Sequence, residues 1–155
     1  MKTKSKTRSV QSRGAETSTC ACTALRKASR AVARQYEIAF SKAGVSATQY
    51  SILRALQREG ALPLSRLADL LVMERTSLYR AIRPLQKQGL VKTRGTTDQR
   101  VKEIVLMAAG LRKIKEAYPH WLDAQQAFLK QVGVPHWERM AAELSDVTAA
   151  MVRLN

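Results

Sequence analysis

The chain has 155 residues and a mass of 17.3 kDa, which suits one domain or one domain with helical extensions. A hydrophobic content of 45% excludes a wholly disordered protein, and no apolar run approaches the ~20 residues that a membrane-spanning helix needs. The basic start lacks the apolar segment of a secretory signal, and two cysteines cannot form a disulfide framework. We therefore expect a cytoplasmic protein in a reducing compartment, with no membrane partner.

The chain is strongly basic, because 27 Lys and Arg residues against 12 Asp and Glu residues give a net charge of +15. Residues 54–102 hold eleven bases and four acids, whereas residues 103–155 hold six of each. A local basic excess indicates a polyanionic partner such as nucleic acid or an anionic membrane surface, unless it serves solubility alone. The order of the predicted elements decides between these explanations.

Two helices are predicted after a polar start. Residues 1–19 are basic and almost free of apolar side chains, which predicts a disordered tail. Residues 20–44 carry apolar side chains at spacings of three and four, which predicts an amphipathic helix. Its stripe consists of Leu25, Ala28, Val32, Tyr36, Ala39 and Phe40. Ser46 and Gln49 form the pattern of a capping box, which predicts a second helix ending near Gly60.

The middle of the chain has the pattern of a helix-turn-helix followed by a hairpin. Pro63 precedes a short helix, residues 72–74 form a turn, and a further helix runs from about Arg75 to Gln88. Its inner face consists of Leu78, Ile82 and Leu85. The strands expected after this helix cover residues 90–94 and 101–106. This order predicts a winged helix-turn-helix over residues 45–107, whose second helix enters the DNA major groove while the hairpin, or wing, reaches the adjacent backbone or minor groove.

Residues 108–155 return to helical spacing, with a break at residues 133–135. The last helix has an apolar seam at alternating spacings of three and four, which is typical of helix association. The seam consists of Trp137, Met140, Leu144, Val147, Met151 and Leu154. We favour a homodimer interface formed by residues 20–44 and 108–155, with packing inside one chain as the alternative. The expected fold is mainly α with a small β-hairpin wing, flanked by dimerisation helices.

Four motifs point to one family. They are LADLL at 67–71, RTSLYR at 75–80, LQKQGLV at 85–91 and DQR at 98–100. Together they resemble the MarR (multiple-antibiotic-resistance regulator) family over residues 20–153. The resemblance implies an obligate dimer that binds pseudo-palindromic double-stranded DNA operators, usually as a repressor, with release by a small aromatic ligand or by thiol oxidation. The chain departs from the family pattern at Glu74, Gln99 and Met107, where Ser or Asp, a basic residue and a capping hydroxyl are more usual.

The outer face of the second turn helix carries the expected DNA contacts. The expected base-reading residues are Thr76, Ser77, Tyr79 and Arg80. Arginine pairs bidentately with guanine, and threonine methyl groups contact thymine. Arg83 and Lys87 lie further along the helix and are expected to hold phosphate. Arg75 is also expected to belong to the DNA-binding residues. The alternative is an ordinary solvated helix face.

The wing adds a second group of basic side chains. They are Lys92, Arg94, Arg100 and Lys102. We expect Arg94, Asp98 and Arg100 to belong to the DNA-binding set, with the Asp98 carboxylate holding the Arg100 guanidinium in one orientation. A purely structural ion pair in the turn is the alternative, and both can hold together.

Two further groups are candidates for regulation. The residues that could line an effector cleft, placed there by the family resemblance, are Tyr36, Tyr50, His120 and Trp121. Ordinary aromatic core is the alternative. Cys20 and Cys22 stand at a helix start, where a thiol can acquire a lowered pKa and sense oxidants; two small buried residues in a dimer contact are the alternative.

No enzyme motif accompanies these features. The chain has no glycine-rich phosphate loop, no Gly-x-Ser-x-Gly and no paired-His motif, and its two histidines lack partners at metal spacing. We therefore expect a DNA-binding transcriptional regulator with no cofactor or metal. A basic RNA-binding or architectural protein without a specific operator is the alternative, although the aromatic sheet or GXXG loop of an RNA module is missing.

Overall fold

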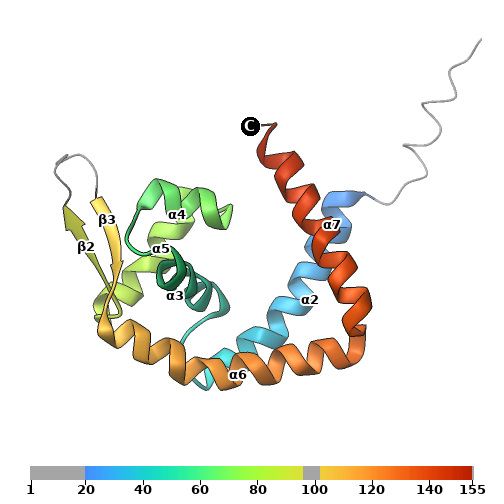
Figure 1. The fold of residues 1–155 in the computed structure, drawn as a ribbon, viewed down its shortest axis with the longest axis horizontal. Helices are drawn as coiled ribbons and strands as arrows, with labels where there is room; N and C mark the ends of the chain where they lie inside the picture. Colours follow the sequence, from blue (N-terminus) through green and yellow to red (C-terminus); the bar gives the residue numbers. More distant parts are fainter. Residues whose placement is uncertain (1–19, 96–101, 155) are drawn as a thin grey trace, which may run out of the picture. The chain divides into compact units, whose positions relative to one another are not determined.

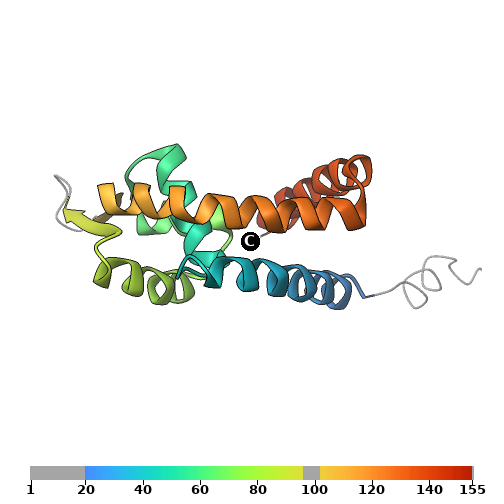
Figure 2. The ribbon, with the colours of Figure 1, turned by 90° about the horizontal axis from the view of Figure 1, so that it is seen from below.

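A computed structural model describes residues 20–95 and 102–154 of the chain (Figures 1 and 2). The helices are α2 (Ala21–Ser41), α3 (Ala47–Glu59), α4 (Leu64–Leu71), α5 (Arg75–Lys87), α6 (Ala108–Val132) and α7 (Val134–Val152). The strands are β1 (Leu62–Pro63), β2 (Val91–Gly95) and β3 (Lys102–Leu106). The chain divides into two compact units, Met1–Val32 and Ala33–Asn155, and the described part of the first is the beginning of α2. None of the described helices is long and apolar enough to cross a membrane.

The hydrophobic core of the second unit is built around α3. Five of its side chains are buried, namely Tyr50, Ile52, Leu53, Ala55 and Leu56. The predicted capping box is confirmed, because the Ser46 Oγ accepts from the Gln49 N–H at 3.1 Å and the Gln49 Oε1 accepts from the Ser46 N–H at 2.9 Å. Val45, just before the cap, is buried in the same core as Tyr50. The start of α3 is thereby fixed by both polar and apolar contacts.

The predicted helix-turn-helix is formed by α4 and α5. The apolar inner face of α5 is confirmed, since Leu78, Ile82 and Leu85 are all buried. Between the two helices, Val72 adopts the left-handed conformation with φ 50° and ψ 47°. A β-branched residue is unfavourable in this region, so the turn stores backbone strain at Val72.

The wing belongs to a three-stranded sheet, where the sequence predicted two strands. The strand order is β1-β3-β2, with Leu62 opposite Ile104 and Val91 opposite Leu106. The two-residue strand β1 is too short to show an alternating pattern. Pro63, predicted as a helix start, also belongs to β1, where its missing N–H is tolerated at the edge of the sheet.

The two C-terminal helices carry much of their apolar surface outside the core. α6 continues through Pro119, and Gly133 separates it from α7 with φ 86°. Trp137 packs edge-on against Phe128 of α6, with ring centroids 5.0 Å apart. α7 has no buried residue, and Met151 and Leu154 at the end of its seam are 52% and 75% exposed. The predicted seam is therefore half-buried at Trp137, Met140 and Leu144 and exposed from Val147 onward.

Candidate nucleic-acid interface and ligand cavity

The outer face of α5 is polar, basic and solvent-exposed. Every predicted DNA contact on this helix is exposed, namely Arg75, Thr76, Ser77, Tyr79, Arg80, Arg83 and Lys87. Thr76, Arg80 and Arg83 are spaced by four and three residues, so they follow one stripe of the helix surface. No acidic residue lies within α5. The exposed bases and the lack of acidic residues make this face suitable for contact with a polyanion.

Two hydrogen bonds attach the wing to the end of α5. The Gln86 Nε2 donates to the Thr93 Oγ1 at 2.7 Å, which joins the last turn of α5 to β2. The Leu90 N–H donates to the Leu85 carbonyl oxygen at 2.9 Å. Lys92 and Arg94 on β2 are exposed. The basic side chains of the helix and of the wing are thus held on one connected support.

An ion pair across the wing orients one of the predicted contacts. The Arg94 Nη2 lies 2.8 Å from the Glu103 Oε2, and the two residues face each other across β2 and β3. The Arg94 side chain is 55% exposed, so it remains accessible to a partner. The sequence interpretation missed Glu103, because strand register cannot be read from the sequence across a loop of unknown geometry. The predicted pair of Asp98 and Arg100 lies outside the described residues, as does the predicted tail over residues 1–19.

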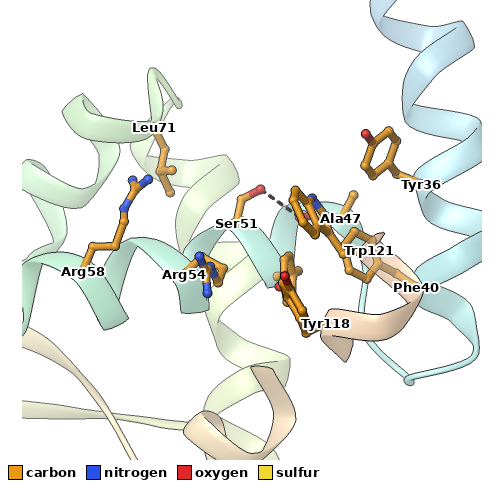
Figure 3. Close-up of a pocket in the computed structure, with 10 residues that line it drawn as sticks. Tyr36, Phe40, Ala47, Ser51, Arg54, Arg58, Leu71, Tyr118 and Trp121 are labelled. Atoms are coloured by element: carbon orange, nitrogen blue, oxygen red, sulfur yellow. Dashed lines mark hydrogen bonds between the residues drawn. The ribbon is translucent and has the colours of Figure 1, made fainter. Parts of the chain in front are cut away.

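A cavity of about 450 Å³ in the second unit is lined by residues of α2, α3, α4 and α6 (Figure 3). Its lining consists of Tyr36, Phe40, Ala47, Tyr50, Ser51, Arg54, Arg58, Leu71, Tyr118 and Trp121. The Phe40 and Tyr50 rings lie 4.6 Å apart between centroids, and the Tyr118 and Trp121 rings are stacked at 5.6 Å. The walls are therefore aromatic, while α3 supplies two guanidinium groups.

Burial and charge act together on the tyrosines of this cavity. Burial raises the pKa of the Tyr36 hydroxyl, which donates a hydrogen bond to the Gln125 Oε1. Burial also raises the pKa of Tyr50, while the nearby Arg54 guanidinium lowers it and Tyr118 raises it further. Both hydroxyls therefore stay protonated near neutral pH and can donate or accept hydrogen bonds.

Three of the four residues predicted for an effector cleft line this cavity, namely Tyr36, Tyr50 and Trp121. His120 is not part of the lining, because consecutive helical residues point about 100° apart. The sequence interpretation missed Arg54 and Arg58. Their signal was present, since they follow Tyr50 at spacings of four and eight and so share its side of α3.

The two cysteines are exposed and free. A hydrogen bond from the Thr23 side chain, followed by backbone hydrogen bonds, lowers the pKa of the Cys20 thiol. This exposure is that of one chain alone, and both a redox role and burial in a dimer contact stay predictions. Among the described residues, no group of three or more His, Cys, Asp or Glu side chains is placed to hold a metal ion.

Comparison with known proteins places the chain in a family. The profile of the MarR family matches residues 45–102, which include the whole helix-turn-helix, β2 and the first residue of β3. The chain is 31% identical to the Mycobacterium tuberculosis transcriptional regulator MosR, whose structure was solved in complex with DNA. The match covers 86% of this chain and 98% of that one, with a TM-score of 0.74. The chain belongs to the MarR family.

More distant MarR-type structures share the fold. Escherichia coli MarR is 16% identical with a TM-score of 0.66, over 84% of this chain and 97% of that one. Bordetella bronchiseptica BpsR, whose DNA binding is regulated by 6-hydroxynicotinic acid, is 17% identical with a TM-score of 0.76, over 85% and 95%. No curated protein matches the chain. The predicted mainly helical, winged fold is confirmed, and the MarR family is one of transcription regulators rather than enzymes.

Proposed function

We propose that this MarR-family chain is a homodimeric, sequence-specific DNA-binding regulator and that α5 enters the major groove of its operator. The observation that carries the proposal is the exposed outer face of α5, which has no acidic residue and is joined to a basic wing. The relative MosR was solved in complex with DNA, and a mutant of E. coli MarR was solved with operator DNA. These relatives support the same role for the winged module here.

The proposed contacts divide between recognition and positioning. Thr76, Ser77, Tyr79 and Arg80 read base edges from the first half of α5. Arg75, Arg83 and Lys87 hold phosphate groups, which fix the register without reading sequence. On the wing, Arg94 and Arg100 approach the backbone or minor groove, and the Asp98 carboxylate holds the Arg100 guanidinium in one orientation.

The uncovered helices support a homodimer. Residues 20–44 and 108–155 are proposed as dimerisation segments around the winged domain 45–107. The apolar side chains of α7 are exposed in the single chain, and Leu25 and Val32 at the start of α2 are also exposed. A second copy of the chain would remove this apolar surface from water. Two α5 helices related by a two-fold axis then require half-sites about 10 base pairs apart.

We propose repression as the direction of control, with release when a small aromatic anion enters the cavity. The aromatic walls suit a planar ring, and Arg54 supplies a positive charge beside Tyr50. The 6-hydroxynicotinic acid that regulates the relative BpsR is a compound of this kind. Oxidation of Cys20 is a second proposed route of release, supported by its exposure and its lowered pKa.

One experiment tests the proposed function against the alternatives. The full chain is titrated, across a salt series, against its own upstream DNA, a random duplex of equal length and a double-stranded RNA. The proposal predicts 10³-fold or greater preference for one DNA sequence, as is usual for specific regulators. Equal binding to both DNA duplexes would indicate an architectural protein, and preference for the RNA would indicate an RNA-binding one.

A further inference from the structure

The first turn of α6 contains a glycine, Gly110, whose neighbours leave no room for a side chain. Gly110 is buried, and a Cβ atom built on it would lie less than 3.0 Å from the Leu90 carbonyl oxygen and from Cδ1 of Leu106. Real Cβ atoms do not approach other atoms so closely, so a side chain would force one element to move. Gly110 lies inside a helix without a positive φ, and the constraint on it is therefore steric.

The backbone that Gly110 contacts lies where α5 ends and the wing begins. The Leu90 N–H donates to the Leu85 carbonyl in α5 at 2.9 Å, and the Leu90 carbonyl accepts from the Met107 N–H at 3.0 Å. Met107 joins β3 to α6, whose first turn follows directly from the wing (Figure 1). Leu90 is thus the point at which α5, both wing strands and α6 meet.

We propose that Gly110 is a positioning residue for DNA binding: by allowing α6 to lie on the Leu90 carbonyl, it fixes the angle between α5 and the wing. The inference rests on the proposed function, because it concerns how two surfaces reach one duplex. Lys92 and Arg94 follow Leu90 by two and four residues on β2. A shift of Leu90 relative to α5 is therefore carried directly to these side chains, while the outer face of α5 stays where it was.

Gly110→Ala distinguishes a steric role of Gly110 from a simple effect on helix propensity, because the two predict opposite outcomes. Alanine is a better helix former than glycine, so Gly110→Ala would stabilise α6 if space were available. With the Leu90 carbonyl in the way, the added methyl group must displace α6 or the strand beneath it. The wing and α5 would then no longer fit one groove geometry at the same time.

The test measures binding of Gly110→Ala to a duplex selected by the wild-type chain from a random pool, and to a random duplex of equal length. We expect a folded protein that binds the selected duplex about ten-fold more weakly, because the wing and α5 no longer fit that duplex together. The salt slope on that duplex should fall by about one for each phosphate group that the wing no longer holds. Binding to random DNA should weaken by a several-fold smaller factor, because no fixed register is needed there.

Two matched variants locate the cause. Ala108→Gly changes helix propensity in the same turn at an exposed position without touching Leu90, and it should leave both affinities unchanged. Leu106→Ala combined with Gly110→Ala removes the side-chain part of the steric conflict but leaves the Leu90 carbonyl. Binding should not recover in this double variant. Full recovery would show that Leu106 packing alone matters and would overturn the proposal.

The remaining outcomes are also decisive. Unchanged selectivity and salt slope in Gly110→Ala, with a selective wild type, would overturn the positioning role and leave the proposed function intact. Failure of Gly110→Ala to fold, or equally weakened binding to both duplexes, would make Gly110 a residue of stability only. If the wild-type chain does not discriminate between the duplexes, the proposed function itself is overturned. Gly110 would then have no sequence-specific complex in which to act as a positioning residue.

Discussion

The winged module and the last helix have the same kind of apolar pattern, but the side chains are buried in the first and not in the second. In α5, the apolar residues Leu78, Ile82 and Leu85 are buried by the rest of the same chain. In α7, an equally regular seam is left with no buried residue, and Val147 is 45% exposed. Hydrophobic periodicity therefore predicts that a helix face will be covered, but it does not say by which molecule. The contrast is the structural reason for proposing a second copy of the chain.

The largest expected effect comes from placing charge in the α7 seam. The double variant Val147→Lys/Met151→Lys should separate the dimer, because two lysines cannot be buried unpaired in an apolar contact. Operator affinity should fall by about 10²–10⁴-fold, since the two winged modules would no longer bind as one unit. Sedimentation and a binding titration check this. Ala149→Lys, on the opposite side of α7, should keep both the dimer and the affinity; dissociation in this control would count against the seam.

Shortening a core side chain of the winged module should lower the stability of the single chain rather than the stability of the dimer. Leu78 is fully buried, so Leu78→Ala should lower the free energy of unfolding by about 2–5 kcal/mol. Val147→Ala should instead produce a destabilisation that shrinks as the protein is diluted, because Val147 is buried only in the associated protein. Chemical unfolding at several protein concentrations distinguishes the two. Equal and concentration-independent destabilisation would contradict the difference between the two regions.

Substitutions on the outer face of α5 should distinguish residues that read bases from residues that bind any DNA through its phosphate groups. Arg80→Ala should cost about 1–3 kcal/mol on the selected operator and much less on random DNA. Lys87→Ala should weaken both by a similar factor and reduce the salt slope by about one. The measurement is a binding titration of each variant on both duplexes over a salt series. If Arg80→Ala loses the same affinity on both, this face does not read bases.

The smallest expected effect is a gain in stability at the helix turn. Val72→Gly should raise the free energy of unfolding by about 0.5–1 kcal/mol, because relief of the left-handed conformation outweighs the cost of glycine's greater freedom in the unfolded chain. Val72 is 60% exposed, so little apolar burial is lost. Val72→Ala keeps a Cβ at the same φ and should gain less. Thermal unfolding of both variants is the measurement, and a destabilised Val72→Gly would argue against strain at this turn.

Local patterns were sufficient for most of the helical fold. The Ser46 and Gln49 capping box and the buried face of α5 were readable because their partners lie within one or two helical turns. Strand β1 escaped notice because it has two residues and depends on pairing with Ile104, far away in the sequence. The ion pair of Arg94 with Glu103 depends on strand register for the same reason.

A candidate site was easier to predict when its residues lie close together in the sequence. The α5 face follows directly from helical spacing, whereas the cavity brings together four helices whose packing no single segment encodes. The family resemblance placed an effector cleft beside Tyr36, Tyr50 and Trp121, and Arg54 was overlooked because an arginine on a helix is usually solvated. Gly110 gave no sequence signal at all, since its constraint comes from the backbone of Leu90.

The central claim is that two copies of α5 read one operator. Hydroxyl-radical footprinting of the full chain on its selected duplex tests it most directly. The account predicts two protected half-sites of related sequence, about 10 base pairs apart between centres and on one side of the duplex. A single protected half-site, or uniform protection that moves with the duplex ends, would contradict it.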